Sequence, residues 1–422
     1  MKTNNDLIHQ MRTYSEKTVG PTMCLYVEWV LAEAHKRGFK RLYFLARDGY
    51  LLFEIAKKAI KKRGMDIECR YLYCSRQALR IPSYHLIGEE AFDLLTLGGY
   101  YLTPKSVISR AMISDETVNE ILCELGISRP DEPFCENEFV GFSNKLRKNE
   151  KYRKAVADIS LAAYEKTIDY FKQEGLFDNN YVAIVDSGWT GSMQRSLRQL
   201  MQNEGYTGKF YGFYFGMYTE PKSAEDGEYL TFYFDSKKGF WKKLFFNNNL
   251  FECMLSAPHP MTIGYMERNG NIAPVYTKGH ADSLLPLIET QIEAALDYAE
   301  KYFTETCTGS SAQQALKNCY KILKRAMVYP TKEEVELLSN FMFCDDVTEG
   351  YRKSIADRAM LDKLSSYSFF PRLWRKLTGK KNSGANEIFW VYGVIAYCPR
   401  LSRSWHRLNV MMWDIVKATV KK

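Results

Sequence analysis

The sequence predicts an α/β protein built around a parallel sheet. Two segments share one design, in which an apolar strand, a short turn and an amphipathic helix follow one another: "RLYFLARDGYLLFEIAKKA" (41–59) and "VAIVDSGWTGSMQRSL" (182–197). Strands that alternate with helices in this way are typical of parallel sheets. The chain has 422 residues, 46% of them hydrophobic and 26% charged, which is enough for two or three structural units with buried cores.

The first predicted elements alternate between helix and strand. Apolar residues at helical spacing predict a helix over 21–37. A strand over 42–46, a turn at 47–49 and a helix over 51–62 follow, and a second strand is predicted at 70–74. This order is the usual beginning of a parallel α/β sheet.

The middle of the chain changes pattern before the sheet resumes. Residues 81–178 have helical periodicity, with "PDEP" as a break, and strand, turn and helix return at 181–201. The aromatic segment "KFYGFYFGMY" (209–218) predicts a further strand, whereas 219–250 has the composition of a basic loop. Helical patterns then dominate the remainder of the chain.

These patterns divide the chain into three parts. Residues 1–80 and 178–275 together form the predicted α/β core. Residues 81–177 form a helical insertion or cap between two strands, and residues 276–422 form a helical C-terminal region.

Composition narrows the classes of function. The formal net charge of +8 favours anionic partners, but no nucleic-acid-binding signature accompanies it, so nucleic acid is not an expected partner. The ten cysteines are scattered without CxxC pairs or zinc-ligand spacing, which is typical of a reduced, cytoplasmic protein. The polar N-terminus lacks a signal-peptide core, and no apolar stretch reaches the roughly 20 residues that span a bilayer.

The turn after the second of the two similar strands has the composition of a phosphate site. The apolar run ends in Asp186, and a helix follows a turn rich in small residues. Gly188 and Gly191 allow close backbone approach, Thr190 and Ser192 offer hydroxyl groups, and the first helical N–H groups have no intrahelical partner. The pattern also fits a helix N-cap that binds no ligand, and both interpretations stay open here.

The turn after the first strand, "ARDG", offers charged groups instead of small ones. Arg47 supplies a cation, Asp48 a carboxylate and Gly49 a free backbone. Turns at the carboxyl ends of parallel strands in one sheet face the same crevice. A ligand with phosphate groups at both ends and a polyol between them fits this pair of turns.

At this point the sequence resembles a known family, the type I phosphoribosyltransferases. "VAIVDSGWTGSMQRSL" is similar to the family's signature for phosphoribosyl diphosphate (PRPP), and "YFLARDGYLLFEIAKKA" stands where the family has its pyrophosphate loop. The resemblance covers about 38–80 and 178–218 and implies a Rossmann-like core. The family's pair of adjacent acidic residues is reduced here to Asp186, and Trp189 is an additional departure.

A narrower resemblance is to the phosphoribosyltransferase modules of bacterial polysaccharide gene clusters. The combination "FLARDGY", "YLYCSRQALRIP", "VDSGWTGSMQ" and "SAPHP" carries it. It implies an enzyme that transfers 5-phosphoribosyl from PRPP to a hydroxyl of a lipid-linked glycan, releasing pyrophosphate. In such systems a phosphatase leaves ribofuranose behind. The dehalogenase-type phosphatase motif Asp-x-Asp is absent, because Tyr50 occupies its second acidic place, so the phosphatase is expected to be a separate protein.

The resemblance also implies roles for the residues of both turns: in the pyrophosphate loop of the first turn, Asp48 would orient Arg47 or a Mg²⁺-bound water. Thr190, Gly191 and Ser192 would hold the 5-phosphate, while Gly188 shapes the turn. Asp186 would bind the ribose hydroxyls as part of the catalytic centre.

The first turn would receive the pyrophosphate. Arg47 would bind it by charge, with Gly49 supplying backbone and Arg76 adding a second cation, unless Arg76 is only a surface side chain. Mg²⁺ is the implied cofactor, held through water by Asp48 or Asp186.

An acceptor hydroxyl needs a base, and one polar segment in apolar surroundings offers candidates. "NNNLFECMLSAPHPMTIGY" contains Glu252, in a possible short helix where burial would raise its pKa, and His259, between two prolines. A purely structural role fits either residue nearly as well.

Two further functions remain alternatives. One is a nucleobase-salvage phosphoribosyltransferase, which the long insertion and the missing second acidic residue disfavour. The other is a non-catalytic protein of the same fold that binds a phosphorylated ligand for regulation.

The C-terminal region contains two basic amphipathic segments. "FFPRLWRKLTGKK" (369–381) mixes aromatic residues with five Lys and Arg residues. In 402–422 an apolar helical stripe is flanked by basic residues; the stripe is Trp405, Leu408, Met412, Ile415 and Thr419. This composition predicts either peripheral contact with the inner face of an anionic membrane or a terminal helix docked by its apolar face.

Overall fold

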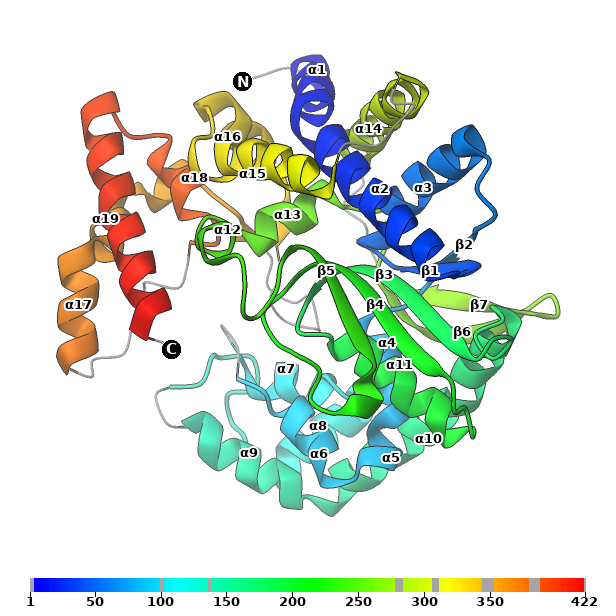
Figure 1. The fold of residues 1–422 in the computed structure, drawn as a ribbon. Helices are drawn as coiled ribbons and strands as arrows, with labels where there is room; N and C mark the ends of the chain where they lie inside the picture. The colour runs from blue at the N-terminus through cyan, green and yellow to red at the C-terminus, as the bar shows by residue number, and fades with distance from the viewer. Residues whose placement is uncertain are drawn as a thin grey trace.

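The computed structural model describes residues 4–98, 102–135, 138–277, 284–305, 311–343, 353–378 and 388–420. At its centre is a five-stranded sheet in the order β2-β1-β3-β4-β5, in which each strand is parallel to its neighbours (Figure 1). The strands are β1 (Arg41–Leu45), β2 (Glu68–Leu72), β3 (Tyr181–Trp189), β4 (Lys209–Met217) and β5 (Glu228–Phe234). The predicted α/β class with a parallel sheet is confirmed.

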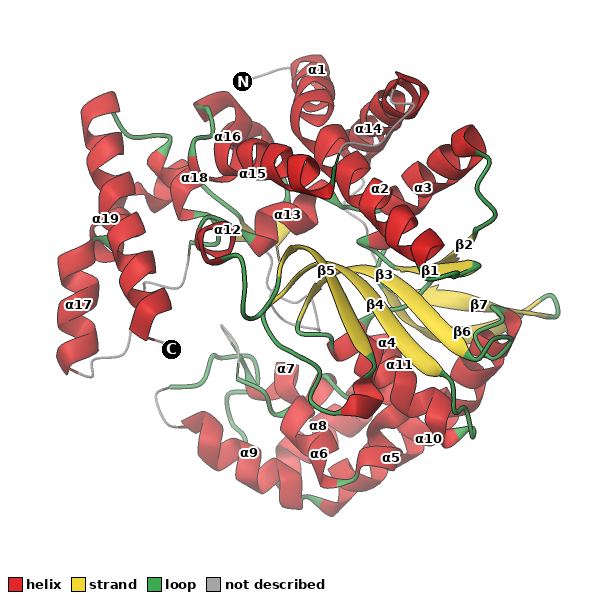
Figure 2. Cartoon of the chain, viewed as in Figure 1, coloured by secondary structure: helices red, strands yellow, loops and turns green. Residues whose placement is uncertain are grey.

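Helices cover both faces of the sheet (Figure 2). On one face lie α2 (Gly20–Lys36) and α3 (Gly49–Arg63), and packed against these are α1 (Asn4–Tyr14), α14 (Leu285–Glu305) and α15 (Ala312–Val328). On the other face lie α4 (Arg76–Arg80), α10 (Glu150–Gln173) and α11 (Ser192–Asn203). Successive strand residues belong to the cores on alternate faces of the sheet: Phe44 is part of the first core and Leu45 is part of the second.

The chain changes face between β1 and β3. The helix after β1, α3, buries Leu51 and Ile55 in the first core, whereas the helix after β3, α11, buries Leu197 and Leu200 in the second. These two neighbouring strands therefore send their helices to opposite faces. In open α/β sheets, ligands bind beyond the carboxyl ends of the strands at such a switch point.

The segment between β2 and β3 is helical over its described residues, as predicted. It begins with α4 and a 3₁₀ turn, and it ends with α10. Between these lie α5 (Tyr84–Ile87), α6 (Glu89–Leu95), α7 (Pro104–Ser109), α8 (Asp115–Glu124) and α9 (Glu138–Lys148). These helices enclose a small core of their own, which contains Phe92 and Tyr152 (lower part of Figure 1).

The prediction of a loop over 219–250 is wrong. The fifth strand, β5, lies there at the edge of the sheet, and it is followed by α12 (Phe240–Leu244) and α13 (Asn248–Met254). An edge strand can keep polar residues because one side stays open to solvent, so its composition resembles that of a loop. The hairpin of β6 (Thr262–Arg268) and β7 (Asn271–Tyr276) was also not predicted.

The C-terminal region contributes to the same hydrophobic core as the first face of the sheet. Trp390 is fully buried, and its indole N–H donates to the carbonyl oxygen of Met327 at 2.8 Å. The remaining elements are α16 (Lys332–Leu338), β8 (Met342–Phe343), β9 (Lys353–Ser354), α17 (Phe369–Thr378), α18 (Val391–Ile395) and α19 (Arg400–Val420). Within the described chain, none of the helices combines the length and the apolar character needed to cross a bilayer.

Candidate active site

The two similar turns lie next to each other at the carboxyl edge of the sheet. Strands β1 and β3 are neighbours, with Phe44 opposite Val185, so their ends arrive side by side. The hydroxyl of Ser187 donates a hydrogen bond to Oδ2 of Asp48, which joins the two segments directly. The predicted proximity of the two turns is confirmed, and it lies at the switch point of the sheet.

The turn after β1 directs its carboxylate away from its own helix. Asp48 occupies the N-cap position of α3, but its side chain makes no capping hydrogen bond. Gly49 passes so close to the strand that an added Cβ would lie 2.8 Å from the backbone carbon of Phe44. The Ala46–Arg47 peptide bond is cis. Because it caps no N–H group of α3, the Asp48 carboxylate is available to Ser187 and to the edge of the sheet.

The strand β3 does not end at Asp186, and this prediction is corrected. It continues to Trp189 and pairs with β4, placing Gly188 opposite Gly216. Gly188 has φ +110°, and a Cβ there would collide with the carbonyl oxygen of Gly216. Gly188 therefore belongs to the strand and not to the turn, because two facing glycines let the ladder continue where a larger residue would stop it.

Three carboxylates gather where the strands end. Asp48 and Asp186 are both half-buried. Burial and the charge of Asp48 raise the pKa of Asp186 to about 8. Burial also raises the pKa of Asp48, against the opposing effects of its hydrogen bond from Ser187 and of the charge of Arg47. The group disfavours three negative charges at once, so it shares protons or attracts a cation.

Glu252 is the third of these carboxylates. It lies in α13, the short helix anticipated from the sequence, and burial together with the charge of Asp48 raises its pKa to about 7. The indole N–H of Trp189 donates to Oε1 of Glu252 at 2.8 Å and opposes that shift. Trp189, which sequence reasoning regarded only as an oddity, thus fixes the orientation of a carboxylate whose pKa lies near neutrality.

Three arginines act on one another by charge, and one of them, Arg76, also acts on the carboxylates. Arg76 and Arg80 are four residues apart in α4, which packs against α11, and Arg195 lies in the first turn of α11. Burial lowers the pKa of Arg80, and the charges of Arg76 and Arg195 lower it further. Among the described residues, neither Arg76 nor Arg80 has a carboxylate within ion-pair distance. The charge of Arg76 acts on Asp48 and Glu252, whereas Arg80 and Arg195 repel each other and form no ion pair with a carboxylate of the described residues, which indicates a place for an anion.

The start of α11 completes this basic side. Gly191 is its N-cap residue in the left-handed conformation, and no side chain caps the helix, so the N–H groups of its first turn lack intrahelical partners. The Arg195 guanidinium donates to the carbonyl oxygen of Thr190 at 2.8 Å. Thr190 is exposed, and Ser192 is the first helical residue. The predicted phosphate-binding residues therefore border the arginine group.

His259 lies apart from the carboxylates, in an aromatic cluster beside the β1 turn. Its Nδ1 is 2.8 Å from the carbonyl oxygen of Pro260 and its Nε2 is 2.7 Å from the Tyr71 hydroxyl. The carbonyl oxygen of Pro260 can only accept, so Nδ1 donates to it, and Nε2 shares a hydrogen bond with the Tyr71 hydroxyl. The other rings of the cluster are Tyr50, Tyr73 and Tyr276. Both ring nitrogens of His259 are thus engaged within this cluster.

Metal ligation would need groups from outside the protein. The described residues contain no set of three or more His, Cys, Asp or Glu side chains that could hold an ion by themselves. Mg²⁺ is commonly bound by one or two carboxylates together with substrate phosphates. Asp48 and Asp186, which repel each other when both are ionised, fit such a site.

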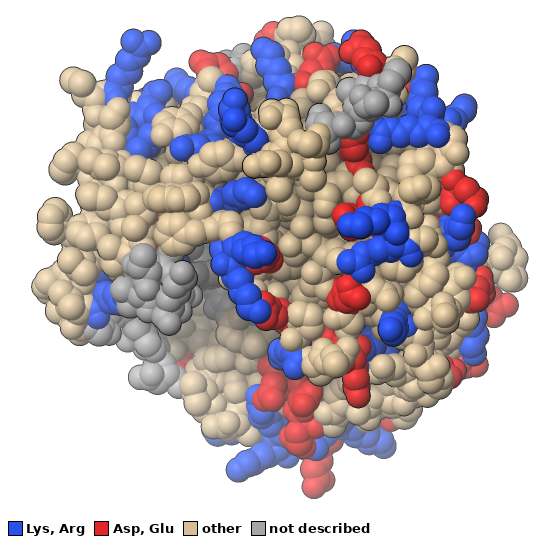
Figure 3. Space-filling model, viewed as in Figure 1, with Lys and Arg blue, Asp and Glu red and all other residues tan. Residues whose placement is uncertain are grey.

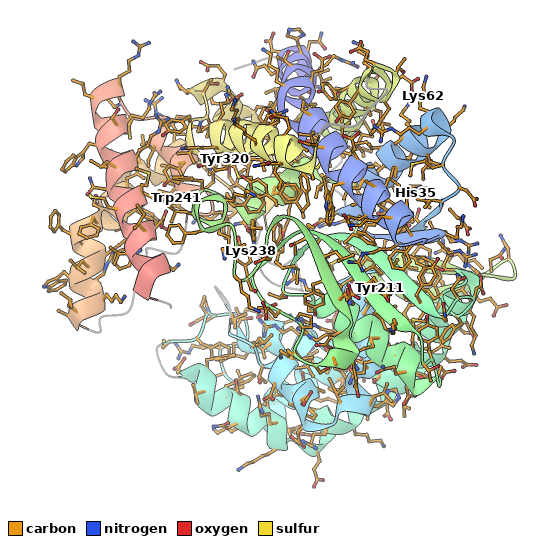
Figure 4. The ribbon with its side chains drawn as sticks, viewed as in Figure 1. His35, Lys62, Tyr211, Lys238, Trp241 and Tyr320 are labelled. Carbon is orange, nitrogen blue, oxygen red and sulfur yellow. The ribbon has the colours of Figure 1, made fainter. Side chains whose placement is uncertain are left out.

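A separate depression opens at the amino ends of the strands. It has a volume of about 660 Å³, and its lining includes Tyr181, Lys209 and Tyr211, of which Tyr211 is labelled in Figure 4. The carboxyl ends point the opposite way, toward α12 and α13 (Figure 2). The depression is thus distinct from the carboxylate and arginine groups.

No family model matches the chain, and no curated protein matches it. The resemblance to phosphoribosyltransferases therefore depends on the motifs of the chain itself. Sequence reasoning missed Arg80, Arg195 and Trp189. Two of these had a usable signal: Arg80 is one helical turn after Arg76, and Arg195 falls in the first turn after Gly191.

Proposed function

We propose that this protein is a phosphoribosyltransferase that transfers 5-phosphoribosyl from PRPP to a hydroxyl of a glycan, with pyrophosphate as the leaving group. The acceptor is proposed to be lipid-linked, as in bacterial polysaccharide synthesis, and a separate phosphatase would remove the 5-phosphate. The core would then be a Rossmann-like sheet of the phosphoribosyltransferase type. The observation that carries the proposal is the hydrogen bond from Ser187 to Asp48, which joins two strand ends of opposite chemical character.

The basic side suits the 5-phosphate of PRPP. The start of α11 has no side-chain cap, Arg195 contacts Thr190 beside it, and the charges of Arg195 and Arg80 act on each other. A phosphate monoester there would accept hydrogen bonds from the helix and neutralise the repelling arginines. Thr190 and Ser192 would add hydroxyl donors.

The carboxylate side suits the ribose and the diphosphate. Asp186 would accept hydrogen bonds from the ribose hydroxyls. Arg47 and Gly49 would face the pyrophosphate, joined by Arg76, whose charge reaches both Asp48 and Glu252. Mg²⁺, held by Asp48 or Asp186 and by phosphate oxygens, supplies positive charge that stabilises the leaving group.

Glu252 would serve as the base in the transfer step. The acceptor hydroxyl gives its proton to Glu252, the acceptor oxygen bonds to C1 of the ribose, and the bond from C1 to the pyrophosphate oxygen breaks with its electron pair going to pyrophosphate. The transition state has oxocarbenium character, as in other glycosyl transfers. A carboxylate with a pKa of about 7 is suited to accept this proton near neutral pH.

The aromatic cluster around His259 offers a place for the acceptor. Tyr50, in the first turn of α3, contacts His259 and stands two residues after Asp48. The five rings of the cluster are all partly exposed. Their faces suit a flat apolar surface of a sugar ring, while the hydroxyls of Tyr50 and Tyr73 suit its polar rim.

The decisive experiment is incubation with PRPP, Mg²⁺ and synthetic lipid-linked glycans, followed by mass spectrometry of the glycan. We expect a mass gain of one phosphopentose and release of pyrophosphate, and we expect Asp186→Ala to abolish both. Asp158, an exposed carboxylate on α10, provides the matched control as Asp158→Ala. If Asp186→Ala kept full activity, Asp186 would not be part of the active site.

Two outcomes would favour the alternatives. Rapid formation of nucleotides from purines or pyrimidines, with no glycan product, would identify a nucleobase-salvage enzyme. PRPP binding without pyrophosphate release from any acceptor would identify a non-catalytic regulator. The regulator would retain the two anion sites but would need no base at Glu252, so Glu252→Gln would leave its ligand binding intact.

A further inference from the structure

Two C-terminal helices expose large apolar side chains. In α17 and α19, six such side chains have between 44% and 91% of their surface accessible: Phe370, Trp374, Leu377, Leu401, Trp405 and Leu408. They make up six of the fifteen large hydrophobic side chains that are exposed among the described residues. Scattered exposed hydrophobics are ordinary, but a concentration on two adjacent helices marks an interaction surface.

The six residues form one stripe on each helix. The positions 370, 374 and 377 in α17 repeat the spacing of 401, 405 and 408 in α19, which places each set on a single helical face. The predicted stripe of α19 is corrected accordingly: Leu401 belongs to it, while Met412 and Ile415 are half-buried. The side chains of Thr419, Lys421 and Lys422, and residues Lys380 and Lys381, lie outside what the structure describes.

The opposite faces of the two helices pack onto the protein. In α17 the Arg372 guanidinium lies over the rings of Tyr367 and Trp413, and in α19 Asn409 and Val410 are buried. The helices also contact each other. Because the opposite face of each helix is packed against the protein, the two stripes are exposed to solvent.

Tryptophan is distributed unevenly over the molecule. All seven tryptophans are described, and three have exposed side chains: Trp241, Trp374 and Trp405. Trp241 belongs to α12, which packs against α19, and Figure 4 shows it at this end of the molecule. Tryptophan favours the boundary between water and lipid, where its ring is in apolar surroundings and its N–H remains hydrated.

The charge around the stripes is basic. The helix α17 contains Arg372, Arg375 and Lys376 and no acidic residue. The helix α19 contains three arginines and a lysine, and its single acidic residue, Asp414, is not exposed. In Figure 3 the side that carries these helices is mainly tan, with Lys and Arg at its upper end.

We propose that the exposed face of α17 and α19 docks on the surface of an anionic membrane. The helices would lie in the plane of the interface, with the aromatic and leucine side chains among the acyl chains and the basic side chains against the headgroups. A second copy of the chain is a poorer partner, because pairing two such faces would bring like charges together. This proposal does not depend on the phosphoribosyl transfer.

Flotation of the full chain with lipid vesicles tests the proposal. We expect binding to vesicles of three parts phosphatidylcholine and one part phosphatidylglycerol, and at least tenfold weaker binding to pure phosphatidylcholine. Raising the salt from about 0.1 M to about 0.5 M should weaken the anionic binding, because screening shortens the reach of the charges.

Variants separate the apolar contribution from the charge. Leu377→Ser/Leu401→Ser/Trp405→Ser should reduce anionic binding at least tenfold, whereas Val140→Ser/Leu161→Ser, at exposed positions in the helical insertion, should leave it unchanged. Lys376→Glu/Arg400→Glu alters two exposed cations and keeps the stripes. It should remove the preference for anionic vesicles and provides a test even if the triple variant fails to fold.

Two results would overturn the proposal. One is equal flotation of the wild type, the triple stripe variant and Lys376→Glu/Arg400→Glu. The other is a wild-type dimer in sedimentation velocity that the triple variant converts to a monomer, in the absence of vesicle binding, which would assign the face to a second copy.

Discussion

The turn after β1 and the turn after β3 have the same strand–turn–helix layout but opposite chemistry. The first presents charged side chains, with Asp48 turned away from its own helix toward Ser187. The second presents backbone N–H groups at an uncapped helix, and arginines from α4 and α11 border it. The same strand–turn–helix layout can therefore bind both ends of a ligand. The residues of the turn decide whether side chains or backbone N–H groups are presented to the ligand.

Neither side is favourable for the fold by itself. Burial and the charge of Asp48 raise the pKa of Asp186 and of Glu252, and burial and the charges of Arg76 and Arg195 lower the pKa of Arg80. Groups that repel within one site are retained when a ligand relieves the repulsion, which is typical of functional sites. Breaking either side should therefore reduce activity while making the fold more stable.

The largest effect is expected from Asp186→Asn. The substitution keeps the shape but removes a group that can ionise when PRPP and Mg²⁺ arrive, so transfer should fall by at least about 10³-fold. The melting temperature should rise, because a carboxyl group with a pKa raised to about 8 is replaced by an amide that carries no charge. Steady-state kinetics and calorimetry on the same preparation measure both.

Asp158→Asn is the control for this substitution. It lies on an exposed position of α10 and should change neither quantity. If Asp186→Asn lost activity and stability together, the carboxylate would be a structural group. The proposal that the carboxylates repel one another in the folded protein would then be wrong.

The next effect concerns Glu252. With a pKa of about 7, it is protonated at lower pH and cannot accept the acceptor proton there, so kcat/KM should fall about tenfold per pH unit below pH 7. Glu252→Gln should lower kcat by about 10²- to 10³-fold and remove this acidic limb. A pH profile of both enzymes measures it.

Trp189→Phe sharpens the assignment. The indole N–H lowers the pKa of Glu252, so its loss should move the acidic limb of the profile to higher pH while leaving a working base. An unchanged limb in Trp189→Phe, together with a retained limb in Glu252→Gln, would assign the titration to another group.

A smaller effect is expected on the basic side. Arg80→Gln should raise the KM for PRPP about 10- to 100-fold with kcat little changed, because it removes a charge from the phosphate and not from the reacting bond. Arg198→Gln is the matched control on α11, since Arg198 is paired with Glu225 and Asp226.

The two arginine variants should differ in stability as well. Arg198→Gln breaks ion pairs and should lower the melting temperature without changing KM, whereas Arg80→Gln relieves repulsion and should not lower it. If Arg198→Gln changed KM more than Arg80→Gln did, the phosphate would bind elsewhere than at the start of α11.

The main features of the fold could be predicted because its buried strands are continuous apolar runs. The strands β1, β3 and β4 bury most of their residues, in unbroken apolar runs such as 182–185, which leaves a clear sequence signal. The edge strand β5 is only partly buried, and its mixture of polar and apolar residues predicts a loop where the structure has a strand. The end of β3 was missed because Gly188 normally interrupts a strand, and only its partner Gly216 shows that pairing continues.

The candidate site was predicted unevenly for a physical reason. The turns are local in sequence, so Asp48, Asp186 and the small residues of 188–192 could be found from their positions after strands. The grouping of Arg80 with Arg195 depends on how α4 packs against α11, and the contact of Trp189 with Glu252 joins residues 63 positions apart. Such tertiary contacts leave no local pattern in a single sequence.

The smallest expected effect is a difference in how the melting temperature of carboxylate and arginine variants depends on pH. An aspartate whose folded pKa is raised binds more protons in the folded state between about pH 4 and pH 8, so its contribution to stability falls as pH rises through that window. Asp48→Asn/Asp186→Asn should therefore lose less stability than the wild type between about pH 5.5 and pH 8, by roughly 2 °C in melting temperature. Arg80→Gln should track the wild type, because no arginine titrates in this range. Parallel curves for the wild type and the double variant would mean that the carboxylates ionise freely in the folded protein, and the repulsion that distinguishes the β1 side from the β3 side would not exist.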